Sequence, residues 1–223
     1  MEGPPIDIII LQNPPSSKDF LPGFSGLKLF APPIARLKVP CYVSPKFLRL
    51  FSVLTFFPSE AEDFMALDVY TPKRCFGSSF PRFRIGNVYA GPHDLPLGSL
   101  SPETSLINFD FLSLVAGDFN IQNPALYPFR VLSSNEESEA APYLNWASNL
   151  GFSLLNIPGT LRLFCFTCTH RPSAIDLTFV NPYMFPAFRR WDASSLPSTG
   201  SHHLFILLSM NDDNSDGPES LLT

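Results

Sequence analysis

Near its centre the chain reads Leu112-Ser113-Leu114-Val115-Ala116-Gly117-Asp118-Phe119-Asn120, an apolar run that ends in an acid and an amide. The run predicts a buried strand, and the polar pair marks the end of that strand. A carboxylate and a carboxamide two residues apart at a strand end can together hold a metal ion and a water molecule. Gly-Asp also marks ordinary turns, so Asp118 and Asn120 taken alone favour a turn. The choice between a site and a turn depends on the rest of the chain.

The composition indicates one globular domain rich in strands and loops. The chain has 223 residues, of which 45% are hydrophobic and 16% are charged, and this length is enough to bury a large core. Its 24 Pro and 22 Phe are both above average usage, and prolines at this density favour short strands, many loops and little long helix. We expect one domain over residues 1–210 and a disordered acidic tail over residues 211–223.

Charge and hydropathy limit the partners. The net charge of −5 argues against the broad basic surface that grips duplex DNA, so nucleic-acid binding is expected to be local. The sequence shows no signal-peptide pattern and no apolar run long enough to span a membrane. We therefore expect an intracellular protein, nuclear or cytoplasmic, that is not secreted and has no membrane partner.

The four cysteines are expected to be reduced, because their spacing fits no disulfide framework. Cys165 and Cys168, followed by His170, invite a zinc interpretation. A second Cys or His pair that would complete four ligands is missing, so the two cysteines are interpreted as strand residues that flank Phe166.

Apolar and β-branched runs predict a series of strands. They lie at residues 6–11, 27–30, 36–43, 48–57, 66–70, 83–89, 112–116, 152–155, 161–169, 175–180 and 204–208. The run at 6–11 lacks polar alternation, which predicts a central strand covered on both faces. Many strands with few helices suggest two packed sheets with helices outside.

One clear helix is predicted after a polar surface loop at residues 133–139. Pro142 suits its first turn and Gly151 suits its end. Its buried face is expected to hold Tyr143, Ala147 and Leu150, which recur at helical spacing. A second, short helix is predicted near residues 102–108.

Polar residues recur at the predicted strand ends, in the order Asn13, Tyr89, Asp118 with Asn120, Asp176, and His202 with His203. The segments around them resemble motifs of the endonuclease/exonuclease/phosphatase superfamily, and most closely those of the endonuclease domain of non-LTR retrotransposons. The matching segments are Asp7 to Gln12, Gly117 to Asn120, Arg171 to Phe179 and Gly200 to Phe205. The resemblance runs from about Ile6 to Leu208.

This resemblance implies an α/β (α+β) fold, a four-layer α/β/β/α sandwich in which two mixed β-sheets are flanked by helices. It also implies an activity, the metal-dependent hydrolysis of DNA phosphodiester bonds. The implied cofactor is Mg²⁺, with Mn²⁺ as a possible replacement, and the implied partner is DNA.

The resemblance also implies residue roles. Asp118 would activate or position the attacking water, and Asn120 would hold that water or the phosphate. Asp176 would orient the imidazole of His203, which would stabilise charge in the transition state, and Tyr89 would contact the phosphate. Structural alternatives stay open: an acid bonded to backbone amides for Asp176, a surface histidine for His203 and an aromatic at the rim of the core for Tyr89.

Two substitutions fall on metal-binding positions that the resemblance implies. Asn13 stands where the family has its main magnesium-binding glutamate, and an amide contributes no charge. His202 stands where the family has an aspartate, and imidazole suits zinc or copper better than magnesium. A strand with a catalytic asparagine, expected ahead of Asp7, is not found, and Phe205 replaces a proline. These departures predict a degenerate, truncated copy with weak metal binding.

Three functions therefore stay open on the sequence. The first is an endonuclease-like domain of a non-LTR retrotransposon with impaired activity, and the second is a catalytically dead relic, a pseudoenzyme that keeps the fold. The third is a phosphatase of the same superfamily, whose phosphoinositide-type motifs are not evident. We expect the reverse transcriptase domain of the parent element to be absent from this chain.

Overall fold

The computed structural model describes residues 6–12, 26–31, 38–56, 63–70, 82–90, 113–126, 131–158, 175–193 and 206–210. Several predictions lie outside the described residues, namely the short helix at 102–108, the strand at 161–169 and the tail at 211–223. Three candidate site residues also lie outside them: Asn13, His202 and His203.

A six-stranded sheet has the strand order β4-β5-β6-β7-β9-β8. Its strands are β4 (Ser52–Phe56), β5 (Phe64–Tyr70), β6 (Arg82–Tyr89), β7 (Ser113–Asp118), β8 (Ser153–Leu154) and β9 (Asp176–Val180). Strand β7 runs parallel to β6 and antiparallel to β9, which makes the sheet mixed. Every residue of β7 is buried, so the strand predicted before Asp118 is confirmed as a central one.

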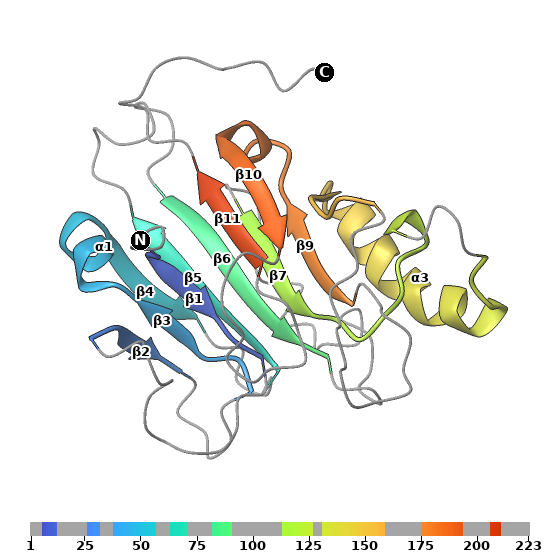
Figure 1. The fold of residues 1–223 in the computed structure, drawn as a ribbon, viewed down its shortest axis with the longest axis horizontal. Coiled ribbons are helices and arrows are strands. Elements are labelled where there is room, and N and C mark those ends of the chain that lie inside the picture. The colour runs from blue at the N-terminus through green and yellow to red at the C-terminus, as the bar shows by residue number, and fades with distance from the viewer. Residues whose placement is uncertain are drawn as a thin grey trace.

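Five short strands form a second β-layer on one face of the large sheet (Figure 1). One antiparallel sheet contains β1 (Ile8–Ile10), β3 (Cys41–Val43) and β2 (Lys28–Phe30), and another contains β10 (Phe188–Ala193) and β11 (Ile206–Met210). Both small sheets contribute to one hydrophobic cluster with the large sheet, which we call the inner cluster. Its members include Ile8, Met65, Ile85, Leu114 and Leu208.

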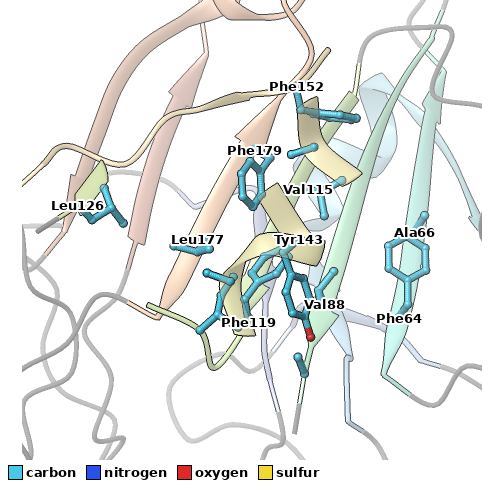
Figure 2. Close-up of a cluster of buried hydrophobic side chains, with 14 of the residues drawn as sticks. Phe64, Ala66, Val88, Val115, Phe119, Leu126, Tyr143, Phe152, Leu177 and Phe179 are labelled. Carbon is cyan, nitrogen blue, oxygen red and sulfur yellow. The ribbon is translucent and has the colours of Figure 1, made fainter. Parts of the chain in front are cut away.

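Helix α3 (Ser134–Asn149) covers the other face of the large sheet (Figure 1). Figure 2 shows the resulting outer cluster, in which Tyr143 of α3 meets Phe119 and Phe179. The Phe119 ring lies edge-on to the rings of Tyr143 and Phe179, at centroid distances of 5.8 and 5.4 Å. On the inner side the short helix α1 (Pro45–Leu50) adds Phe47 and Leu48 to the inner cluster. Sheets and helices confirm the predicted α+β sandwich.

Helix α3 begins earlier than the sequence analysis predicts, so the predicted loop at 133–139 is wrong. Ser133 Oγ accepts a hydrogen bond from the Glu136 N–H, and the Glu136 carboxylate accepts one from the Ser133 N–H at 2.7 Å. This capping box starts the helix at Ser134, about two turns ahead of Pro142, which lies inside the helix and not in its first turn. Gly151 ends the helix as predicted, with a φ of 69°.

Two predicted strands differ in the structure. The run at 48–57 begins as helix α1, because Ser44 Oγ accepts the Phe47 N–H at 3.0 Å and Pro45 suits a first turn. Strand β1 was predicted to be central, yet within the described residues it pairs with β3 alone and is only half-buried at Ile8 and Ile10. Strand β10 has no counterpart among the strands predicted from the sequence. Two 3-10 turns, Pro124–Leu126 and Phe185–Ala187, complete the described elements.

None of the helices in the described ranges has the length and apolar character that crossing a membrane requires. Cys41 is the one cysteine among the described residues, and it is a free and fully buried thiol. Burial raises the pKa of this thiol, and its hydrogen bond with Asn87 only partly opposes the rise, so Cys41 is expected to be unreactive.

Gly117 lets β7 approach β6 closely. Its φ is 154°, and a Cβ at this position would lie 1.9 Å from the carbonyl oxygen of Val88. A side chain would therefore push apart the two parallel strands that lead to Tyr89 and Asp118.

We predict that Gly117→Ala lowers the free energy of unfolding by at least about 3 kcal/mol, because backbone atoms of a central strand must move. Urea unfolding followed by circular dichroism measures this loss. Gly151→Ala is the matched control, since Gly151 has a positive φ with no atom near its Cβ position, and it should lose only about 1 kcal/mol. Equal losses in the two variants would contradict the role assigned to the close approach.

Candidate functional site

Tyr89, Asp118 and Asp176 lie in one row across three adjacent strands. Tyr89 is the register partner of Asp118, and Asp118 is the register partner of Asp176. All three side chains are directed toward the second β-layer, because Tyr89 itself, and residues four positions from the two aspartates, pack in the inner cluster. Three candidate residues that are far apart in the sequence are therefore neighbours at one end of the sandwich.

A second row lies two residues from the first on the same three strands, toward the middle of the sheet. Asn87, Ala116 and Thr178 are register partners there and share the face of the first row. Gln12 Nε2 donates a hydrogen bond to Asn87 Oδ1 at 2.8 Å. Trp191 Nε1 of β10 donates one to Thr178 Oγ1 at 3.3 Å. Side-chain hydrogen bonds thus join both parts of the second layer to the large sheet, one on each side of Ala116.

Asp118 and Asn120 form a tight turn at the end of β7. Asp118 Oδ1 accepts a hydrogen bond from the Asn120 N–H at 2.9 Å. Asn120 has a φ of 49°, in the left-handed region that asparagine tolerates better than most residues. Asn120 Nδ2 donates to the Ala90 carbonyl oxygen, which uses one of its two hydrogens. The turn interpretation is therefore correct, and it is compatible with a site that uses the same residues.

The two aspartates are buried, with 6% of Asp118 and 5% of Asp176 exposed. Side chains directly opposite each other on antiparallel strands have Cβ atoms about 5 Å apart. Two carboxylates at this spacing repel each other in a low-dielectric environment, and hydrogen bonds or positive charge must offset that repulsion. Hydrogen bonds, a cation or a protonated imidazole beside the row would each offset this repulsion.

The donor chemistry fits a divalent cation only in part. Carboxylate and amide oxygens of Asp118, Asp176 and Asn120 are the hard ligands that Mg²⁺ prefers. Among the residues that the structure describes, no group of three or more His, Cys, Asp and Glu side chains is placed to hold a metal. The described residues therefore include oxygen ligands of the type that suits Mg²⁺, but they do not by themselves form a metal site.

Asn87 fixes the segment that leaves β1. This asparagine is fully buried. Its Nδ2 donates to the carbonyl oxygens of Leu11 at 2.8 Å and Pro40 at 3.1 Å, while its Oδ1 accepts from Gln12. The side chain therefore holds the residue that directly precedes Asn13. Asn87 is not among the site residues predicted from the sequence, although an asparagine within an apolar strand was a possible signal.

Asn156 holds the backbone of β9 at Asp176 with two side-chain hydrogen bonds. Its Nδ2 donates to the Asp176 carbonyl oxygen at 2.8 Å, and its Oδ1 accepts from the Thr178 N–H at 2.7 Å. Beyond the end of β8, the Leu155 N–H donates a hydrogen bond to the Thr178 carbonyl oxygen of β9. The Asn156 side chain extends this hydrogen bonding by one more residue. Asn156 is likewise not among the predicted site residues, because only the strand register reveals its two partners.

We predict that Asn87→Asp and Asn156→Asp each lower the free energy of unfolding at pH 7 by about 2–4 kcal/mol, since a carboxylate cannot donate to the carbonyl oxygens. A buried carboxyl in such a variant has a higher pKa when folded than when unfolded. The loss should therefore grow as the pH rises above about 4 and shrink below it. Urea unfolding at several pH values measures both effects.

Asn123→Asp and Asn181→Asp are the matched controls for these variants. Asn123 Oδ1 accepts from the Ala125 N–H and Asn181 Oδ1 accepts from the Tyr183 N–H, and aspartate can make the same bonds. Both controls should stay within about 1 kcal/mol of the wild type. If all four variants lose the same stability, burial alone decides the effect and the donor role of Asn87 and Asn156 is wrong.

Solved structures share this architecture. The endonuclease domain of TRAS1, a telomere-specific non-LTR retrotransposon, matches with a TM-score of 0.67 and 15% identity, over 92% of this chain and 85% of that chain. A 3′ phosphatase variant, NExo from Neisseria, bound to a product DNA hairpin, matches with a TM-score of 0.59 and 16% identity, over 93% and 90%. An AP endonuclease from Archaeoglobus fulgidus matches with a TM-score of 0.58 and 14% identity, over 92% and 89%.

No protein-family profile and no curated protein matches the chain. The similarity to known proteins is therefore seen in the structure comparisons, and it agrees with the order of the motifs in the sequence. This chain has the endonuclease/exonuclease/phosphatase fold.

Proposed function

We propose that this chain is an endonuclease-like domain of the non-LTR retrotransposon type, which hydrolyses DNA phosphodiester bonds at a site with impaired metal binding. The observation that carries the proposal is the row of Tyr89, Asp118 and Asp176 on adjacent strands. Two carboxylates and a phenol at the ends of adjacent strands can bind a phosphate ester and position its attacking water. The similar fold of the TRAS1 endonuclease domain supports the same reaction class.

The path of the chain supports a contribution from His203. Strand β9 leads away from Asp176, and β10 returns along it, since Trp191 of β10 bonds to Thr178 of β9. Strand β11 pairs antiparallel with β10 and starts at Ile206, opposite Ala193. It therefore starts at the end of the sandwich where Asp176 lies. His203 precedes Ile206 by three residues, a chain length of at most about 10 Å.

In the proposed reaction, the protein groups position the reactants and stabilise charge. The Asp118 carboxylate accepts a hydrogen bond from the attacking water, and the second amide hydrogen of Asn120 is directed to that water or to the phosphate. Asp176 orients the His203 imidazole toward the phosphate, where its positive charge opposes the charge that develops. The Tyr89 hydroxyl donates to a phosphate oxygen.

Asp118 would hold a divalent cation, together with residues 13 and 202. Such a cation, when bound, supplies positive charge to the non-bridging phosphate oxygens. Asn13 and His202 replace two acids that the resemblance implies, and Mg²⁺ depends on carboxylates because it loses its water reluctantly. Asn87 holds Gln12, the last described residue before Asn13, in place.

Two alternatives are tied to particular observations. A catalytically dead relic is favoured by the two replaced ligands, Asn13 and His202. A phosphatase is favoured by the similar fold of the 3′ phosphatase from Neisseria, which was solved with a product DNA hairpin. The following experiments separate these alternatives.

The first prediction is that the purified chain nicks supercoiled plasmid DNA slowly in Mn²⁺ and more slowly still in Mg²⁺. Asp118→Ala should reduce the rate at least about 100-fold, because the group that positions the water is removed. Asn123→Asp is the control, since Asn123 belongs to a separate turn. No nicking by the wild type in either metal would favour the relic. Phosphate release from a DNA 3′-phosphate or from inositol phosphates without nicking would favour the phosphatase.

The second prediction is that Asn13→Glu combined with His202→Asp raises the nicking rate in Mg²⁺ at least about 10-fold, because both carboxylates are restored. The concentration of Mg²⁺ at half-maximal rate should fall in parallel. Adding Asp118→Ala to the double variant should abolish the gain, which excludes a contaminating nuclease. If the double variant gains neither rate nor metal affinity, replaced ligands are not the defect.

A further inference from the structure

Phe119 supports the end of β7 from the outer face of the sheet. Side chains alternate along a strand, so Val115, Gly117 and Phe119 lie on the side of the outer cluster, while Asp118 faces the second β-layer. Gly117 has no side chain to contribute to this packing. Between Val115 and Asn120, the Phe119 ring is therefore the one outer-face side chain that packs beneath the turn of residues 118–120.

Backbone hydrogen bonds hold this turn within the plane of the sheet. Toward β6, the Ala90 N–H donates to the Asp118 carbonyl oxygen at 2.8 Å. Toward β9, the Phe119 N–H donates to the Ile175 carbonyl oxygen at 3.0 Å. Such bonds run across the strands and keep them from sliding or separating, but strand twist varies widely between sheets with the same bonding. The twist of the strand end, which directs the Asp118 carboxylate and the Asn120 carboxamide, therefore needs a further support.

Two other rings hold the Phe119 ring at a defined angle (Figure 2). Phe119 is fully buried, and its ring meets those of Tyr143 of α3 and Phe179 of β9 at interplanar angles of 81° and 75°. Aromatic pairs prefer this edge-to-face arrangement. Phe179 is itself edge-on to Trp146, three residues after Tyr143 on α3. Because these contacts are directional, a twist of the strand end that turned the Phe119 ring would weaken both of them.

We propose that Phe119 and Tyr143 are positioning residues whose edge-on ring contact sets the twist at the end of β7, and thereby the directions of Asp118 and Asn120. The proposal rests on the proposed function for the roles of these two polar side chains. It goes beyond that function because it makes helix α3, on the opposite face of the sheet, part of what shapes the site. Neither ring touches the substrate, and both act through the backbone of residues 118–120.

Asn120 is the residue most sensitive to a loss of this support. Its φ of 49° lies in the left-handed region, which is less favourable than the ordinary regions even for asparagine. Two hydrogen bonds keep it there, from its N–H to Asp118 Oδ1 and from its Nδ2 to the Ala90 carbonyl oxygen. A twist of the strand end would weaken both bonds, so the Asn120 side-chain amide reports on the geometry of the turn.

Nuclear magnetic resonance of the full chain tests the proposal without needing activity. The readout is solvent exchange of the Asn120 side-chain NH₂ group, whose signals are assigned by their loss in Asn120→Asp. Phe119→Leu and Tyr143→Leu each remove one ring of the contact, and both should speed this exchange at least about 10-fold. The rate of plasmid nicking in Mn²⁺ at saturating DNA should fall at least about 10-fold in the same two variants, because misplaced groups position the water poorly.

Two control variants separate positioning from general stability. Tyr143→Phe keeps the ring, so its exchange and nicking rates should stay within about 2-fold of the wild type. Phe152→Leu removes another ring of the outer cluster, one that stacks on Trp146 at a centroid distance of 5.6 Å. It should lose stability as Phe119→Leu does, yet keep the slow exchange of the Asn120 amide. Tyr143→Leu decides the test if Phe119→Leu does not fold.

The possible failures are distinguishable. If Phe152→Leu speeds the exchange as much as Phe119→Leu and Tyr143→Leu do, global opening explains the effect and the positioning role is wrong. It is also wrong if Phe119→Leu and Tyr143→Leu keep the exchange and nicking rates of the wild type. If the wild type does not nick, or Asp118→Ala nicks as fast, the proposed function fails. The exchange measurement requires no turnover, so it still decides whether the two rings hold the turn.

Discussion

The parallel pairing of β6 with β7 fixes where the polar residues lie. Because the two strands run in the same direction, both end at one edge of the sheet, and their register sets Tyr89 beside Asp118. Strand β9 starts at that edge on the other side of β7 and adds Asp176. The close approach of β6 and β7 requires Gly117, where a side chain would collide with the Val88 carbonyl oxygen. One glycine and one register thus decide whether the row exists.

Buried polar side chains, and not apolar packing alone, hold the second β-layer in its place. Asn87 contacts the segment after β1, and Thr178 contacts β10, close to the row on either side. Hydrogen bonds of this kind select one arrangement because displacing the layers leaves buried groups unpaired. The residues that build the scaffold differ from those expected to bind the metal. Replacement at Asn13 and His202 can therefore weaken chemistry while the fold persists.

Much of the fold could be predicted from local patterns, because apolar runs mark β5, β6, β7 and β9 directly. Errors arose where two local signals competed. Pro142 suggested a helix start, but the capping box of Ser133 and Glu136 starts α3 earlier. Strand β10 (Phe188–Ala193) contains two arginines and an aspartate, so it lacks the apolar run by which the other strands were predicted. The roles of Asn87 and Asn156 depend on cross-strand register, which no single segment contains.

We propose that the row formed by residues 89, 118 and 176 is a phosphodiester site. Anomalous diffraction from crystals grown with Mn²⁺ and a short DNA duplex tests this most directly, since it locates the metal without relying on turnover. We expect a manganese peak at coordination distance from an Asp118 carboxylate oxygen, with a DNA phosphate beside it. Manganese and phosphate bound together elsewhere, with Asp118 and Asp176 facing neither, would contradict it.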